Sequence, residues 1–396
     1  MKNSLFLIKD FISKETLSGL ILFVVTVLAV TIANSSFGSY YFELFSTQLG
    51  ITFGQLNASM SLLHWINDVL MAIFFLVVGL EIKREMLIGE LSSVKKASFP
   101  IIAAIGGMIV PAILYISLNP DHITGFGVPM ATDIAFALGI LMLLGNKVNP
   151  AIKLFLVTLA VVDDLGAIVV VAIFYTNELH LEYFLYAFAV YSIIWFLNYK
   201  NVQKLTPYII LGVFLWIFIH KTGIHSTIAG VLLAFAIPLN KKADLEESVE
   251  HLSVDNPLVK LEHALHNFSA FIIMPLFAFA NAGVIIDFSN VIEHQLIVLG
   301  VALGLIIGKP IGIFSFTYLA TKLKISVKPE NVTWNDIFAV GFLGGIGFTM
   351  SIFISHLAFS DETIVGAVKL GIFASSVIAA IIGSVLLILK AKKVQS

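Results

Sequence analysis

Two adjacent aspartates, Asp163 and Asp164, lie in the middle of an apolar stretch that runs from Ala151 to Tyr175. A charged side chain at the centre of a bilayer costs about 2.5–3.5 kcal/mol on insertion scales. A second carboxylate beside the first adds to that cost, because each negative charge disfavours ionisation of the other. We therefore expect the pair to hold a cation, a proton, or each in turn. The alternative is a pair of neutral, hydrogen-bonded acids.

Three further polar residues have apolar surroundings. Thr132 and Asp133 follow a proline in GFGVPMATDIAFALG, and Lys309 stands in GLIIGKPIGIF. Thr132 and Asp133 could bind a cation, or cap a broken helix locally. Asp133 and Lys309 carry the two charges that would offset the partial charges at facing helix ends. A membrane lysine can also snorkel to the interface, which fits Lys369 near the end of its span better than Lys309.

Six more titratable residues lie near the ends of apolar segments. Histidine titrates between about pH 5 and 8, so a pH-dependent role is one interpretation. Solvated helix ends and an ordinary interfacial histidine are the alternatives. The group comprises Glu81 and Glu85 in GLEIKREM, His225 in GIHST, and Glu262, His263 and His266. The His-x-x-His pair lacks the further ligands of a zinc site, and we expect no cofactor.

The composition identifies the elements that must position these residues. The chain has 396 residues, of which 59% are hydrophobic and 12% charged, whereas globular domains carry about 25% charged residues. A net charge of −2 gives no basic signature for nucleic acid, and the absence of cysteine excludes disulfides and thiol catalysis. These values indicate a membrane protein.

About twelve apolar segments are long enough to cross a membrane, since a spanning helix needs about 20 residues. Twenty of the 23 Lys and Arg residues fall at the two ends of the chain or in every second loop. The positive-inside rule then places both termini in the cytoplasm. We expect an all-α polytopic protein with one transporter domain over 1–396. The spans are roughly 16–34, 65–82, 97–118, 125–145, 151–175, 182–199, 205–220, 223–239, 263–285, 294–320, 335–357 and 363–389.

Two loops are longer than the others. The 35–64 loop lacks Lys and Arg and is expected outside, with a possible short hairpin in ITFGQLNASMSLL. The 240–262 loop contains both acidic and basic residues and is expected in the cytoplasm.

Glycine and proline interrupt the fourth and eleventh spans. Pro129 removes a backbone donor from the fourth span, and the eleventh reads GFLGGIGFTMSIFI. Each break lies in the middle of a block of three spans, 3–5 and 10–12, and the two blocks begin on opposite sides. Paired breaks in inverted halves indicate the midplane binding site of a transporter. Close helix packing is the simpler reason for the glycines.

These motifs together resemble one family. AVVDDLGAI, MATDIAFALG, GKPIG, VGLEIKREM, GIHSTIAG, PLFAFANAGV and GFLGGIGFTMSIFI are similar, in this order, to the bacterial NhaA-type sodium–proton antiporters. The resemblance implies alternating-access export of Na+, with Li+ as a substitute, in exchange for more protons than sodium ions. It further implies activation by rising pH, a homodimer in contact with membrane lipid, and a bacterial inner membrane location.

The resemblance also implies roles for single residues. Asp164 is expected to be the central sodium ligand, Asp163 its partner in proton exchange, and Thr132 a neighbour of the ion. Asp133 is expected to offset helix dipoles. Lys309 is expected to balance the broken helices, to pair with Asp163, or to carry a proton, and the sequence does not choose among these. The roles in pH sensing fall on Glu81, Glu85, His225, Glu262, His263 and His266.

Three rival functions fit parts of the same pattern. A sodium–solute symporter would need a larger polar cavity than the few polar residues in the spans provide. An intramembrane aspartyl protease needs two aspartates on different helices, and Asp133 with Asp164 would qualify, but a Gly-x-Gly-Asp motif is missing. A passive cation channel would not need a proton-exchanging pair or inverted broken helices.

Overall fold

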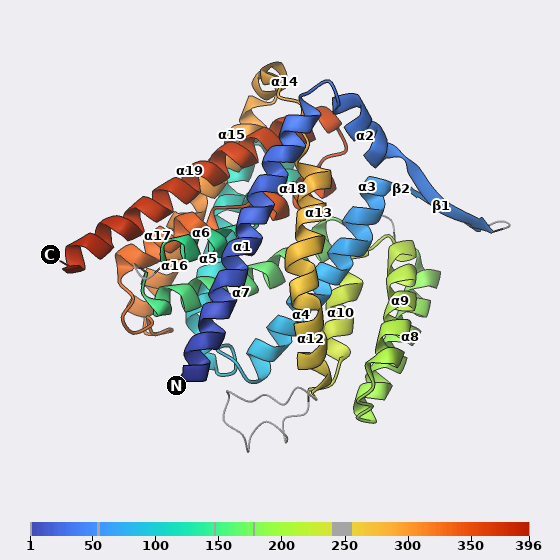
Figure 1. Cartoon of the computed structure of the whole chain (residues 1–396), viewed down its shortest axis with the longest axis horizontal. Helices are drawn as coiled ribbons and strands as arrows, with labels where there is room; N and C mark the ends of the chain where they lie inside the picture. Colours follow the sequence, from blue (N-terminus) through green and yellow to red (C-terminus); the bar gives the residue numbers. More distant parts are fainter. Residues whose placement is uncertain (1, 54–55, 146–147, 177–178, 240–255, 396) are drawn as a thin grey trace. The chain divides into compact units, whose positions relative to one another are not determined.

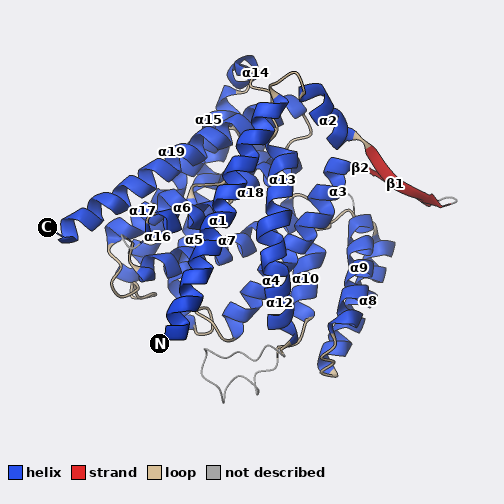
Figure 2. Ribbon diagram, in the orientation of Figure 1, coloured by secondary structure: helices blue, strands red, loops and turns tan. Residues whose placement is uncertain are grey.

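The computed structural model of the chain describes residues 2–53, 56–145, 148–176, 179–239 and 256–395. Side chains are described from residue 16 to 390, apart from 51–58 and the gaps. Within these limits the regular secondary structure is helical except for one pair of strands (Figure 2). The structure therefore confirms the all-α class.

The chain packs into two compact units. Unit 1 contains residues 1–9, 43–89 and 171–277, and unit 2 contains residues 10–42, 90–170 and 278–396. The helices α1 (Lys2–Ala33), α2 (Gly38–Ser46), α7 (Pro150–Phe174) and α13 (Met274–Ala282) each contribute residues to both units.

Unit 1 is built around an apolar cluster. Its buried members include Leu80, Tyr208, Leu215, Ala234 and Leu258. In Figure 1, α8 and α9 lie side by side in this unit, and α4 packs on α10 and α12. The elements are β1 (Gln48–Phe53), β2 (Leu56–Ser61), α3 (Leu62–Trp65), η1 (Ile66–Leu70), α4 (Met71–Leu87), α8 (Leu181–Tyr199), α9 (Leu205–Thr222), α10 (Ile228–Ala236), α12 (Pro257–Phe268) and η5 (Ser269–Ile273).

Unit 2 carries the interrupted helices. Its most extensive helix pair is α5 with α16, which approach so closely that a Cβ on Gly106 or Gly312 would collide with the backbone of the other helix. The elements are α5 (Val94–Leu118), η2 (Pro120–Met130), α6 (Ile134–Leu143), α14 (Phe288–Glu293), α15 (Gln295–Leu303), η6 (Gly304–Gly308), α16 (Lys309–Lys322), α17 (Trp334–Gly344), α18 (Phe348–Ala358) and α19 (Glu362–Gln395).

Two helix pairs in unit 2 are bent where the sequence predicts a break. The pair η2–α6 bends by 47° and the pair α17–α18 by 51°. Pro129 lies in η2 and cannot donate a backbone hydrogen bond. Phe348, at the second break, has a φ of 21°, which is uncommon for a residue other than glycine. The two predicted discontinuous helices are thus present.

The predicted count of twelve spans is not confirmed. Among the described residues, nine helices are long and apolar enough to cross a membrane, and eleven spans result if each bent pair counts as one. The remaining expected span, 223–239, contains only the nine-residue helix α10. Glycine at 223 ends α9 with a left-handed φ of 87°, and the helix does not resume until Ile228.

The two long loops differ in what the structure describes. In the 35–64 segment, β1 and β2 form an antiparallel pair, with Gln48 opposite Ser61 and Leu49 opposite Met60. Residues 54–55 at the turn lie outside the described residues, as does the 240–255 part of the expected 240–262 loop.

Candidate functional site

The two central aspartates lie in the middle of α7, and the side chain of each is 3% exposed. Asp163 Oδ2 accepts a hydrogen bond from Thr132 Oγ1 at 2.6 Å and forms an ion pair with the ammonium of Lys309. In the described part of the chain, Asp163 Oδ1 has no hydrogen-bond partner. Asp163 is therefore held on one oxygen and keeps a second oxygen for a further ligand.

Lys309 begins α16, directly after the π-helical turn η6, and is 1% exposed. Its Nζ also donates to Thr132 Oγ1 at 2.8 Å. A π turn widens the helix and is common at functional sites. The pairing with Asp163 compensates a buried ammonium that would otherwise be very unfavourable. Lys309 does not snorkel to an interface.

Thr132 lies in the extended connection between η2 and α6 and links the two charged groups. Its hydroxyl is 2.6 Å from Asp163 Oδ2 and 2.7 Å from the carbonyl oxygen of Gly344. A hydroxyl has one proton, so it donates to one of these oxygens while it accepts from Lys309. Thr132 can thus change its partner without moving out of the cluster.

Asp133 is fully buried and receives bonds from both bent pairs. Its carboxylate caps α6 by accepting from Phe136 N at 3.1 Å, and it accepts from Thr349 N at 3.0 Å and from the Thr349 hydroxyl. Its own N–H donates to the Ile346 carbonyl at 2.7 Å. The N-termini of α6 and α18, each carrying a positive partial charge, therefore converge on one carboxylate.

The crossing also contains partners that the sequence reading missed. Thr349 and the Gly344 carbonyl both contact the predicted residues, and Ser376 Oγ accepts from Phe348 N at 3.3 Å. A hydroxyl residue soon after the glycines of a broken span is a signal for a helix N-terminus, which could have indicated Thr349. The Gly344 carbonyl has no signal in a side-chain pattern.

Most of the predicted pH-sensing residues meet in unit 1. Arg84 Nε is 3.0 and 3.1 Å from the two carboxylate oxygens of Glu262, and Arg84 Nη1 is 2.9 Å from Glu85 Oε1. His266 Nδ1 lies 3.2 Å from Glu81 Oε1. Glu262 is 5% exposed, so its contact with the guanidinium is largely withdrawn from water. Exposed His263 follows it on α12.

Arg84 is the central member of this cluster and was missed as a site residue. In the sequence it was counted only among the Lys and Arg residues that mark every second loop. Its spacing of three residues from Glu81 on a helix would place it beside that acid.

His225 does not join this cluster. It lies in the turn between α9 and α10, where its Nδ1 is 3.0 Å from Thr227 Oγ1. Asp68, an electrostatic neighbour of His225, lies 3.2 Å from His220. Asp68 and Glu81 are separated by about 20 Å of continuous helix, at 1.5 Å per residue. The six predicted residues thus form two separate groups.

The described residues include no group of three or more His, Cys, Asp or Glu side chains arranged to hold a metal ion. The oxygen atoms near Asp163 are nevertheless the kind that a small hard cation prefers. Buried charges at the crossing of two interrupted, membrane-length helix pairs are the architecture of a secondary transporter.

Comparison with known proteins specifies this class further. Residues 9–387 match the family described as Na+/H+ antiporter 1. The chain is 98% identical to Na(+)/H(+) antiporter NhaA 2 of Aliarcobacter butzleri over 395 residues, with 100% of both chains covered. It is 50% identical to the Na(+)/H(+) antiporter NhaA of Wolinella succinogenes, covering 95% of this chain and 92% of that one. The Na(+)/H(+) antiporter NhaA of Helicobacter pylori strain HPAG1 is 49% identical, with 96% and 94% covered.

The chain belongs to the Na+/H+ antiporter 1 family, the NhaA-type sodium–proton antiporters. It is a multi-pass membrane protein of a transporter family.

Proposed function

We propose that the protein exports Na+, or Li+, in exchange for H+ by alternating access at Asp163 and Asp164. The observation that carries this proposal is the buried cluster of Asp163, Thr132 and Lys309 at the crossing of two bent helix pairs. Its support comes from the charges: a cation that enters beside Asp163 competes with the Lys309 ammonium for the same carboxylate.

In this mechanism the ion binds first to Asp164 and is then also bound by the second carboxylate oxygen of Asp163, Oδ1. Thr132 supplies a hydroxyl oxygen, and its proton can turn to the Gly344 carbonyl when a cation arrives. Sodium and protons compete for the same carboxylates. The site therefore carries sodium in one direction and protons in the other. Asp163, Asp164 and Lys309 are the candidate proton carriers.

Asp133 has a positioning role in this proposal. It does not bind the ion but neutralises the N-termini of α6 and α18, which keeps the crossing intact. Lys309 supplies the complementary positive charge near the carbonyl end of α17, through Thr132.

The stoichiometry follows from the number of proton-binding groups. If both carboxylates take up a proton when the sodium ion leaves, two protons enter for one sodium and the exchange is electrogenic. The rate of sodium-driven proton movement should then respond to an imposed membrane potential, and a rate that is independent of potential would contradict this stoichiometry.

Regulation by pH is assigned to the unit 1 residues. The cluster of Glu81, Arg84, Glu85, Glu262 and His266, with His263 beside it, is proposed to sense cytoplasmic pH. His225 is proposed to respond separately. Activity is expected to rise with pH because protonated aspartates cannot bind sodium. A maximum of activity below about pH 6 would contradict this expectation.

The remaining features of the proposal concern the membrane. We place the protein in the bacterial inner membrane as one transporter domain over 1–396. It has twelve spans, inverted repeats at spans 3–5 and 10–12, and both termini in the cytoplasm. The 35–64 segment is placed outside and 240–262 inside, and the protein is proposed to work as a homodimer.

The decisive experiment measures the pH inside proteoliposomes after sodium is added. Wild type should show sodium-driven proton movement, and Asp164→Asn should abolish it. Asp336→Asn is the matched control, because Asp336 is also a buried aspartate but pairs with Lys390 away from the crossing. A signal that survives Asp164→Asn would refute the site, and no signal in wild type would refute antiport.

A further inference from the structure

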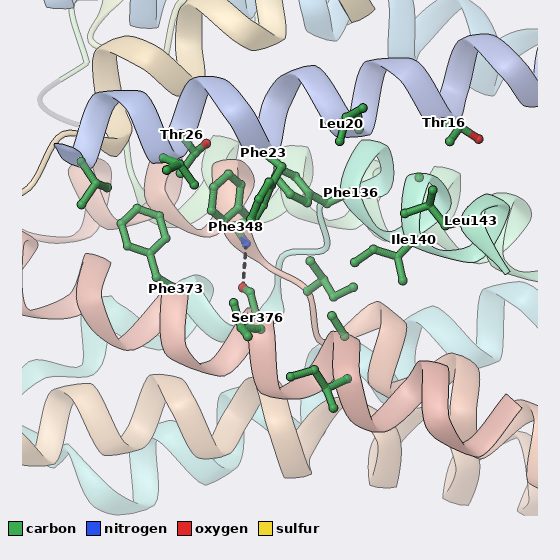
Figure 3. A pocket seen from close by; sticks show the side chains of 18 of the residues that line it. Thr16, Leu20, Phe23, Thr26, Phe136, Ile140, Leu143, Phe348, Phe373 and Ser376 are labelled. Carbon is green, nitrogen blue, oxygen red and sulfur yellow. Dashed lines mark hydrogen bonds between the residues drawn. The ribbon is translucent and has the colours of Figure 1, made fainter. Parts of the chain in front are cut away.

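A cavity of about 640 Å³ lies within unit 2 between α1, α6, α18 and α19. Figure 3 shows Leu20 and Phe23 of α1 on one side of it, and Phe136, Phe348 and Phe373 close by on the other helices. This volume falls within the range of sites that hold small molecules. Neither the sodium–proton exchange nor the pH-sensing cluster makes use of this cavity.

The wall of the cavity is apolar and offers few hydrogen-bonding groups to an occupant. Three of its hydroxyl side chains already have partners in the protein. Thr26 donates to the Leu22 carbonyl at 2.8 Å, Thr31 donates to the Val27 carbonyl at 2.6 Å, and Ser376 accepts from Phe348 N. A polar solute would lose its hydration here without compensation, and water is not held in an apolar cavity of this kind. An occupant of this cavity would therefore be a hydrocarbon.

The mouth of the cavity is continuous with the apolar side of the protein. Among its lining residues, Leu143 is 66% exposed, Val377 54% and Leu20 53%. In a multi-pass membrane protein such a surface faces lipid tails. Hydrocarbon chains are thus the molecules that meet this opening at high concentration. Moving a hydrocarbon chain from the bilayer to a helix surface gains little hydrophobic free energy. Entry of the chain is instead driven by the van der Waals contacts that form when it fills the void.

The inner end of the cavity reaches the break between α17 and α18. Phe348 and Phe136 are only 7% and 8% exposed, and their ring centroids are 4.2 Å apart. Phe348 directly precedes Thr349, which donates to Asp133. A chain in the cavity would therefore contact the first turns of the two half-helices that share this carboxylate.

We propose that one acyl chain of a membrane phospholipid occupies this cavity and packs against Phe136 and Phe348. The chain fills the space behind the broken-helix crossing and supports the convergence of α6 and α18 on Asp133. This inference rests on the shape and chemistry of the cavity, and it would hold even if the proposed ion-binding roles were revised.

The test is photolabelling of the full chain in phospholipid vesicles. The probe is a phosphatidylcholine with a diazirine near the end of one acyl chain, and adducts are mapped by mass spectrometry. Bulk lipid labels exposed positions such as Leu143, whereas Phe136 and Phe348 are 8% and 7% exposed and line the cavity. We expect adducts on these two residues in the wild type.

Two variants on α19 form a matched pair. Ala380→Phe fills the cavity, because Ala380 lines it, and it should abolish the adducts on Phe136 and Phe348. Ile378→Phe lies two residues away, is 43% exposed outside the cavity, and should leave the adducts unchanged. If Ala380→Phe does not fold, Val377→Trp at the mouth replaces it with the same expectation.

Several outcomes would overturn the proposal. These are the absence of both adducts in the wild type, and equal adducts in Ala380→Phe and wild type. Labelling by a diazirine fatty acid but not by the phospholipid would overturn the assignment to phospholipid. Because labelling needs no transport, a failure of sodium–proton exchange would leave this result unaffected.

Discussion

The ion pair between Lys309 and Asp163 offers the sharpest test of the energetics of the site. Replacing Lys309 by Met removes the ammonium but keeps a side chain of similar length. It leaves Asp163, at 3% exposure, with only the Thr132 hydroxyl as a donor among the described residues. We expect Lys309→Met to be strongly destabilising and to abolish exchange.

The size of the destabilisation follows from the burial of both partners of the ion pair. Breaking a buried ion pair by removing one partner costs about 3–5 kcal/mol, because a charge remains buried without compensation. Replacing both partners removes this uncompensated charge. The double variant Lys309→Met with Asp163→Asn should therefore recover most of the loss, and a double-mutant cycle should give a coupling energy of about 3 kcal/mol.

The assay is equilibrium unfolding in mixed micelles for wild type, both single variants and the double variant. Lys369→Met is the control, because Lys369 is a buried lysine whose ammonium has no ion-pair partner among the described residues. Its removal should be neutral or stabilising, since no carboxylate is left behind. Additive single-variant effects, with a coupling energy under about 1 kcal/mol, would show that the pair is not an energetic unit.

Two further predictions concern one residue of each unit. Thr349→Val removes a hydroxyl that donates to the charged Asp133 and should cost about 1.5–3 kcal/mol of unfolding free energy. Thr317→Val should cost less, because that hydroxyl donates to carbonyl groups of its own helix, and equal losses would contradict the sharing of the Asp133 carboxylate by two helix ends. Glu262→Gln weakens the arginine contact and should change the pH profile of exchange in proteoliposomes; an identical profile would remove this cluster from the sensor.

The class of protein and its charged residues were predictable because they depend on local sequence. An apolar run of about 20 residues indicates a span wherever it occurs, and a carboxylate within such a run is costly enough to be functional. Proline and glycine act on the backbone at their own position, which explains why both breaks were predicted correctly. The short helix α10 shows the limit, because its segment is as apolar as a full span but begins after a left-handed glycine.

The partners of these residues were decided by tertiary structure alone. Thr132 and Gly344 are 212 residues apart in the chain, and Asp133 and Thr349 are 216 apart. Hydrophobic periodicity carries no information about such distances, and a backbone carbonyl leaves no trace in the sequence. The same holds for Arg84, whose contact with Glu262 crosses 178 residues.

The sequence by itself therefore determined that this chain is a membrane protein with buried, opposite charges near two interrupted helices. It did so because the free-energy costs of burying a charge and of breaking a helix depend on residues that are adjacent in the sequence. Only the folded structure decided that Lys309 pairs with Asp163, that one carboxylate serves two helix N-termini, and that His225 stands apart from the other titratable residues. These outcomes depend on which helices pack together, and packing is a property of the whole chain.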